Sequence, residues 1–134
     1  MRHTYECQVR WSDVDAYGHV NNVKYFEYYQ EARIAFLATC GQTLLRAEGT
    51  EQFVVARLTV DYRRPILFRR EPFPIDSWVT RIGTSSYDVQ SQIRDGDEVL
   101  SRATAVLVAY DLKAARARPL TDAERTALGA ALVG

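Results

Sequence analysis

The chain has 134 residues, of which 47% are hydrophobic and 25% charged, and its 17 basic and 17 acidic residues cancel. This length predicts one domain over residues 1–134 with a sizeable core, and the balanced charge argues against a nucleic-acid partner. The 2 cysteines and 2 histidines have no disulfide or metal-binding spacing, and no stretch resembles a signal peptide or a transmembrane helix, so we expect a cytoplasmic protein with no metal, no cofactor and no membrane partner.

The N-terminal region predicts a short strand followed by a polar loop. Tyr5, Cys7, Val9 and Trp11 alternate with polar residues, which favours a strand from about Tyr5 to Trp11. Residues 12–21 then combine two acids, a glycine and a histidine with an asparagine, which is a composition typical of a loop.

A long helix is predicted from about Asn22 to Cys40. Apolar residues recur at offsets 0, 3, 4, 7, 10 and 11 from Tyr25, and this spacing gives one wide apolar stripe. The side-chain carbonyl of Asn21 or Asn22 can cap the first turn. Gly41 can supply the left-handed residue that ends the helix.

Four strands are predicted after a polar connection. The alternation of Ala56, Leu58, Val60 and Tyr62 with polar residues indicates a half-buried strand that ends before Pro65. The next three strands run from about Phe73 to Ile82, from Tyr87 to Arg94 and from Val99 to Tyr110, with Asp95-Gly96 as the turn between the last two.

The C-terminal part of the chain predicts a buried strand and a short helix. The last strand is apolar from Ala103 to Ala109, so we expect it to be buried on both faces. Thr121 and Glu124 have the spacing of a capping box, which would open a helix that ends at about Leu128.

This order of elements predicts an α+β fold. Short links between the later strands favour an antiparallel sheet of about five strands, with the long helix packed on one face. Such a sheet leaves its other face and its edges uncovered, so we expect a homodimer or a larger assembly.

The loop before the long helix carries the residue types best suited to acyl chemistry. The first N–H groups of a helix have no internal partners and lie at its positive end, where they could stabilise an oxyanion. Asp15 would then act on the carbonyl carbon as a nucleophile or as a general base. The residue types alone also fit a structural role, with Asp13 and Asp15 in turn and cap bonds and His19 as a hydrogen-bonded loop residue.

A family resemblance favours the catalytic interpretation. Residues 11–25, Trp-Ser-Asp-Val-Asp-Ala-Tyr-Gly-His-Val-Asn-Asn-Val-Lys-Tyr, and the following Phe-Glu-Tyr-Tyr-Gln-Glu-Ala-Arg closely resemble the hot-dog acyl-CoA thioesterases, in particular the 4-hydroxybenzoyl-CoA thioesterase type. The resemblance implies a single hot-dog domain, in which the sheet wraps around the long helix. It also implies an enzyme that hydrolyses an acyl thioester to a free acid and CoA. With the uncovered sheet face and edges, the expected assembly is a homodimer or homotetramer.

The resemblance also implies roles for particular residues. Asp15 is the family's catalytic carboxylate, and the backbone amide of Asn22, seven residues on, is its oxyanion donor. His19, from the same loop, could polarise the substrate or tune Asp15.

The carrier of the acyl group would be held by a turn and by basic residues. In some members of the family the turn that corresponds to Thr84, Ser85 and Ser86 binds coenzyme A or substrate. Some members have consecutive basic residues there, whereas this chain has two serines. The densest basic cluster, which could contact the CoA phosphates instead, consists of Arg63, Arg64, Arg69 and Arg70.

Three other functions remain open on the sequence. The His-Val-Asn-Asn string also resembles the acyl-ACP thioesterases, so the carrier could be CoA or acyl-carrier protein. Hot-dog domains also support hydratases and dehydratases, for which Asp15 and His19 would be the proton-transfer pair. A non-catalytic acyl-CoA-binding protein is the third alternative.

Overall fold

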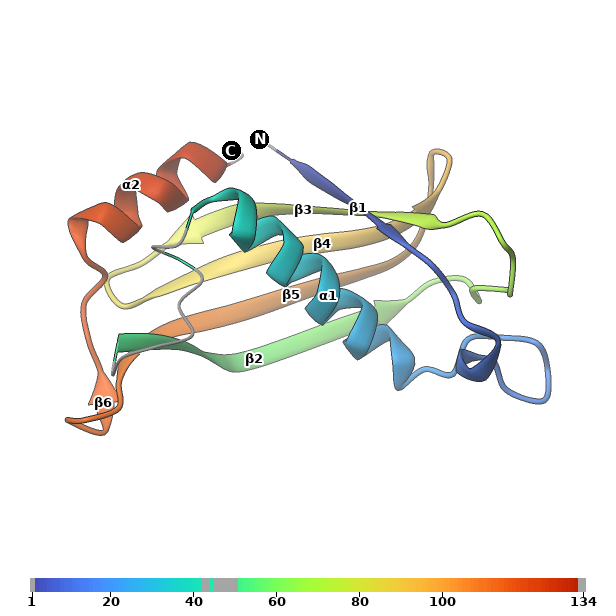
Figure 1. The fold of residues 1–134 in the computed structure, drawn as a ribbon, viewed down its shortest axis with the longest axis horizontal. Coiled ribbons are helices and arrows are strands. Elements are labelled where there is room, and N and C mark those ends of the chain that lie inside the picture. The colour runs from blue at the N-terminus through green and yellow to red at the C-terminus, as the bar shows by residue number, and fades with distance from the viewer. Residues whose placement is uncertain (1, 42–43, 45–50, 133–134) are drawn as a thin grey trace.

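One antiparallel sheet curves around a long helix in the computed structural model, which describes residues 2–41, 44 and 51–132 (Figure 1). The strands are β1 (His3–Cys7), β2 (Glu51–Tyr62), β3 (Phe73–Ile82), β4 (Ser86–Asp95), β5 (Glu98–Asp111) and β6 (Arg116–Ala117), and the helices are α1 (Lys24–Thr39) and α2 (Asp122–Ala131). The sheet order is β1-β3-β4-β5-β2, and β6 pairs with β5. The predicted α+β fold is confirmed, with one strand of two residues more than the sequence suggests.

Strand pairing explains where the strand boundaries differ from the prediction. Cys7 pairs with Phe73, the first residue of β3, so β1 has no partner beyond this point. The chain forms a short 3-10 turn at Trp11–Asp13 instead of continuing the predicted strand. β2 begins at Glu51, earlier than predicted, because β5 offers it a partner as far as Asp111. Residues 51–55 of the predicted polar connection therefore belong to β2, and its residues 42–43 and 45–50 lie outside the described residues.

The helix α1 is shorter than predicted at both ends. It starts at Lys24, after a turn, and it ends at Thr39. Gly41 has a φ of +91°, which confirms the predicted left-handed residue after the helix. The apolar stripe is confirmed, and Arg33 is buried beside it at 8% exposure. Burial lowers the pKa of Arg33, against an opposing effect of Tyr87.

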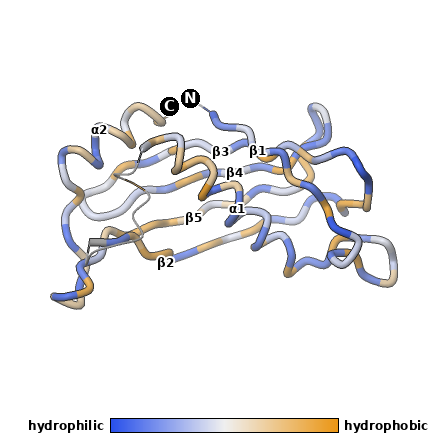
Figure 2. The backbone as a smooth tube through the Cα atoms, in the orientation of Figure 1, coloured by the Kyte–Doolittle hydropathy of each residue, from blue (hydrophilic) through white to orange (hydrophobic). Residues whose placement is uncertain are grey.

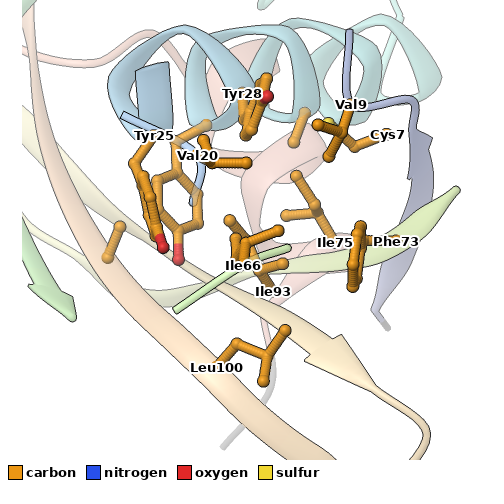
Figure 3. Packing of buried hydrophobic residues seen from close by; sticks show 13 residues of the cluster. Cys7, Val9, Val20, Tyr25, Tyr28, Ile66, Phe73, Ile75, Ile93 and Leu100 are labelled. Carbon is orange, nitrogen blue, oxygen red and sulfur yellow. The ribbon is translucent and has the colours of Figure 1, made fainter. Parts of the chain in front are cut away.

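The core lies between α1 and the sheet and consists of two clusters. The first surrounds the N-terminal half of α1 and is drawn in Figure 3, where Tyr25 and Tyr28 lie above Ile66, Ile75 and Ile93. The second surrounds the C-terminal half of the helix. It includes Phe36, Leu37, Val79, Tyr87, Leu107 and Leu128. Together they fix both ends of α1 against the sheet.

β5 is buried on one face only, so the prediction of burial on both faces is wrong. Ala103, Ala105, Leu107 and Ala109 are buried, whereas the residues between them are half-buried. Figure 2 shows this apolar run in orange. The alternation follows because successive side chains point to opposite faces of a strand, and α1 covers only one of those faces.

The face of the sheet that points away from α1 carries polar side chains that bond to one another. Asp76 accepts hydrogen bonds from Gln92 Nε2 (3.1 Å) and Arg94 Nε (2.7 Å), and Thr104 Oγ1 donates to Gln90 Oε1 (2.7 Å). These bonds pair several polar groups of this outer face within one chain.

The short helix α2 is held against the turn between β3 and β4. Its predicted capping box is confirmed, since Glu124 N donates to Thr121 Oγ1 (3.1 Å) and Thr121 N donates to Glu124 Oε1 (2.8 Å). Glu124 is 1% exposed and is paired with Arg118 at 2.8 Å. Arg125 Nη2 donates to the carbonyl of Gly83 (2.8 Å). Among the described residues, no helix is long and apolar enough to cross a membrane.

Candidate active site

The two acids of the first loop lie in opposite environments. Asp13 is fully buried, whereas Asp15 is exposed. Tyr28 Oη donates to Asp13 Oδ2 at 2.6 Å, and Arg10 N donates to the same oxygen at 3.1 Å. Arg10 Nη2 lies 3.1 Å from Asp13 Oδ1. Burial alone would raise the pKa of Asp13, but the bonds from Tyr28 and Arg10 outweigh it and lower the pKa. Asp13 therefore ties the loop to α1.

The carboxylate of Asp15 shapes the loop with one of its oxygens. Oδ1 accepts hydrogen bonds from the backbone N–H groups of Tyr17 (2.9 Å) and His19 (3.2 Å). Asp15 N donates to the His19 carbonyl (2.8 Å), and a φ of +79° at Gly18 closes the turn. Within the described part of the chain, Oδ2 accepts no hydrogen bond, so it is available to a substrate.

The turn before α1 is capped by Asn21 rather than by Asn22. Asn21 Oδ1 accepts from Val23 N (3.1 Å), and the Asn21 carbonyl accepts from Lys24 N (2.9 Å). The Asn22 carbonyl accepts from Tyr62 Oη (3.0 Å). The backbone N–H of Asn22 donates to no acceptor in the ranges that the structure describes, and it lies at the positive end of α1.

A cavity of about 350 Å³ brings the predicted catalytic residues together. Asp15, His19 and Asn22 line it from the first loop, and Arg63 and Arg64 line it from the segment after β2. A bond from Val20 N to the Ile66 carbonyl (2.8 Å) holds the two segments side by side. The cavity therefore lies at the N-terminal end of α1.

Sequence reasoning did not assign two tyrosines of this cavity. The rings of Tyr25 and Tyr62 meet edge to face with their centroids 4.7 Å apart, and both residues line the cavity. Tyr25 lies on the apolar stripe of α1, so its pattern indicates only a core position. Tyr62 is the last residue of the alternating pattern of β2, immediately before Arg63 and Arg64. This position is the one feature of the sequence that could have indicated that Tyr62 lines the cavity.

The predicted carrier-binding turn lies elsewhere in the same chain. Thr84, Ser85 and Ser86 are at the end of the sheet beside α2, away from the N-terminal end of α1 (Figure 1). Their polar groups take part in local bonds: the Thr84 carbonyl accepts from Leu120 N (2.9 Å), and Ser86 Oγ accepts from Arg81 (2.8 Å). One chain alone does not bring this turn to Asp15.

The arginines of the basic cluster differ in what they contact. Arg69 pairs with Asp95 at 2.9 Å and stacks on Phe73, so its guanidinium is engaged. Arg64 Nε lies 3.3 Å from Glu98 on the protein surface. Arg63 forms no ion pair with any described residue. No three His, Cys, Asp or Glu side chains of the described residues lie close enough together to hold a metal ion.

A sheet wrapped around one long helix is the architecture of a hot-dog domain. The chain belongs to the thioesterase-like superfamily, whose sequence profile matches residues 9–128. Its place in this superfamily and its homologues make the protein a thioester hydrolase.

The relatives agree in fold and in class. The long-chain acyl-CoA thioesterase FadM of Escherichia coli K12 is 29% identical over 118 residues, which cover 86% of this chain and 88% of FadM. A thioesterase from Thermus thermophilus, solved with coenzyme A and zinc, is 31% identical with a TM-score of 0.78, and the match covers 95% of this chain and 92% of that one. The PA2801 protein of Pseudomonas aeruginosa is 32% identical with a TM-score of 0.82, over 94% and 97% of the two chains.

Proposed function

We propose that the protein hydrolyses acyl-CoA thioesters, with Asp15 acting on the carbonyl carbon and the Asn22 N–H binding the oxyanion. One observation carries this proposal. A carboxylate with an available Oδ2 and an N–H without an acceptor among the described residues, at the positive end of a helix, line the same cavity of about 350 Å³. A thioester between them would have its carbonyl carbon near the carboxylate and its oxygen near the amide.

Two chemical routes use these groups. In the first, Asp15 attacks the carbonyl carbon, the thiolate of CoA leaves, and water then hydrolyses the mixed anhydride to restore the carboxylate. In the second, Asp15 takes a proton from water as its oxygen attacks the carbonyl carbon, and the thiolate of CoA then leaves and takes up that proton. In both routes the carbonyl oxygen becomes an oxyanion that the Asn22 amide stabilises. The side chain of His19 lines the cavity and would contact the thioester or the acyl group.

The carrier is coenzyme A in this proposal. Two relatives support it, since FadM is an acyl-CoA thioesterase and the Thermus enzyme was solved with coenzyme A. Arg63 and Arg64 border the cavity on its exposed side, where the phosphates of CoA would lie. Arg63 is the stronger candidate because no described acid neutralises it, and guanidinium groups bind phosphate well.

The protein is a homodimer joined through β2 in this proposal. β2 is an edge strand with β5 as its one hydrogen-bonded neighbour, and Val54 and Val55 on it are 38% and 46% exposed. An exposed apolar edge is a template for pairing with another strand. Sedimentation equilibrium is expected to give a particle of two chains or a multiple of two, and a monomer at micromolar concentration would contradict this.

Such a dimer would also give the turn 84–86 a role. Val54 and Ser86 both pair with Val108, so the turn lies level with the start of β2. Two antiparallel β2 strands related by a twofold axis place the start of one beside the end of the other. The turn of the second copy would then lie near Tyr62 and the cavity, where Thr84, Ser85 and Ser86 could contact the substrate.

A panel of thioesters with free thiol as the readout tests the proposed function. We expect thiol release from acyl-CoAs, and a higher KM for the same acyl groups on pantetheine, because pantetheine lacks the phosphates that Arg63 and Arg64 would bind. Thiol release from acyl-carrier protein thioesters but not from acyl-CoAs would show that the carrier is acyl-carrier protein. Conversion of an enoyl-CoA without thiol release would indicate a hydratase. Tight binding without any turnover would indicate a non-catalytic protein.

A further inference from the structure

A second cavity, of about 440 Å³, lies at the opposite end of α1. It is lined by Phe36 and Cys40 at the C-terminal end of this helix, by His3 of β1 and by residues of α2. The helix has 16 residues, which corresponds to roughly 24 Å between its ends. The second cavity is thus separate from the one that contains Asp15, and it lies away from the β2 edge.

The wall that α2 contributes to this cavity is made of small apolar side chains. Ala127, Ala130 and Ala131 line it, and Phe36 lines it on the side of α1. A concave space of about 440 Å³ is large enough for a small-molecule ligand. Its mostly apolar lining, with a few polar groups, is the usual composition of a small-molecule site.

The polar groups around the cavity are basic or already paired. Thr39 Oγ1 donates to the Phe36 carbonyl at 2.6 Å, which leaves its methyl group for the cavity. Arg2 and His3 line the cavity, and none of the lining residues is acidic. The guanidinium of Arg2 lies 3.8 Å from the centre of the Trp78 ring, which is a cation–π contact. His3 Nδ1 is buried and has no hydrogen-bond partner among the described residues, which is unusual for a buried polar atom.

The partial charges at the ends of the helices indicate where the polar group of a ligand would lie in the cavity. The C-terminal ends of α1 and α2 both border the cavity, and their partial negative charge would repel an anion. An anionic group would therefore lie on the β1 side, near Arg2 and His3. The walls of the cavity suit an aliphatic chain.

We propose that this cavity is a second binding site, and that it takes a straight-chain carboxylic acid, the class of product that the proposed thioester hydrolysis releases. The inference rests on the proposed function for the identity of the acid. The aliphatic chain would lie between Phe36 and the alanines of α2, and the carboxylate would lie beside Arg2 and His3.

The thiol of Cys40 can report on occupancy of the cavity. Cys40 is half-buried and lines it, whereas Cys7 is 4% exposed. Burial raises the pKa of both thiols, and that of Cys7 reaches about 12. Because alkylation needs the thiolate, iodoacetamide should label Cys40 in preference to Cys7. Dodecanoate at about ten times its Kd leaves roughly one site in eleven free, so it should slow the labelling about tenfold.

Substitutions on α2 test whether dodecanoate protects Cys40 from alkylation by binding in this cavity. Ala130→Phe fills the cavity and should abolish the protection by dodecanoate. Ala123→Phe is the matched control, because Ala123 is exposed on the same helix and does not line the cavity. Equal protection in Ala130→Phe, or no protection in the unaltered protein, would overturn the proposal. So would protection that rises with protein concentration in the absence of acid, since a second copy would then cover the cavity.

Two further measurements separate the parts of the inference. Arg2→Gln, at an exposed position, should weaken the binding of dodecanoate about tenfold and leave the binding of dodecanol unchanged. Equal effects on the two affinities would overturn the assignment to an acid. Thiol release from acyl-CoA is measured on the same preparations. Normal turnover without protection of Cys40 would refute only the second site, whereas absent turnover would refute the proposed function.

Discussion

The Asp15→Asn variant is expected to stay folded and to hydrolyse acyl-CoA about 10²- to 10⁴-fold more slowly than the unaltered protein. Asparagine keeps the Oδ1 atom that accepts from the N–H groups of Tyr17 and His19, so the loop should keep its shape. It lacks the negative charge that either chemical route needs. Turnover of the best substrate of the panel, together with the circular dichroism spectrum, measures the two effects separately.

The Asn22→Ala variant tests whether the backbone amide of Asn22, rather than its side chain, binds the oxyanion. It changes the side chain but keeps the backbone N–H, so near-normal turnover is expected if the amide binds the oxyanion. A large loss in Asn22→Ala would mean that the side chain, not the amide, contacts the substrate. Near-normal turnover in Asp15→Asn would show that the catalytic carboxylate has been wrongly assigned.

The Asp13→Ala variant is expected to lose about 2–3 kcal/mol of unfolding free energy. The buried hydroxyl of Tyr28 would lose its acceptor at 2.6 Å, and the Arg10 N–H would lose its acceptor at 3.1 Å. The charge pair itself adds little to this figure, because the side chain of Arg10 is 62% exposed. Urea unfolding measures the loss. A change below about 0.5 kcal/mol, typical of a surface position, would mean that Asp13 does not anchor the loop.

The same carboxylate should make stability depend on pH in the acid range. The pKa of Asp13 is lowered in the folded protein, whereas that of an unfolded aspartate is about 3.9. Its contribution is therefore complete above the unfolded value, and it is lost as the pH falls through the folded value. Unfolding curves of the unaltered protein and Asp13→Ala should converge over that interval. A difference that stays constant with pH would exclude the ionised carboxylate as the source.

The sequence predicted the fold well wherever local chemistry decides it. The capping box of Thr121, the left-handed Gly41 and the apolar stripe of α1 each depend on neighbours in the chain. The ends of the strands and the burial of their faces depend instead on contacts between segments that are distant in sequence. The end of β1 depends on where β3 begins, and the single buried face of β5 depends on α1 covering one side only.

The grouping of the candidate residues around one cavity was predictable to a similar extent. Asp15, His19 and Asn22 lie within eight residues of one another, so a single loop carries them to one cavity together with the predicted Arg63 and Arg64. Residue types alone could not separate the roles of Asp13 and Asp15, because only the fold shows that Tyr28 contacts one and not the other. The family resemblance implies that the turn 84–86 binds substrate, but within one chain this turn lies at the opposite end of the sheet from Asp15.

The bonded side chains on the outer face of the sheet bear on how large the particle can grow. If the proposed dimers stacked through this face, Gln90 and Arg94 would lose contact with water, and any of their N–H or carbonyl groups left unsatisfied would cost about 1–3 kcal/mol. These polar groups make this side of the protein a poor surface for a second interface.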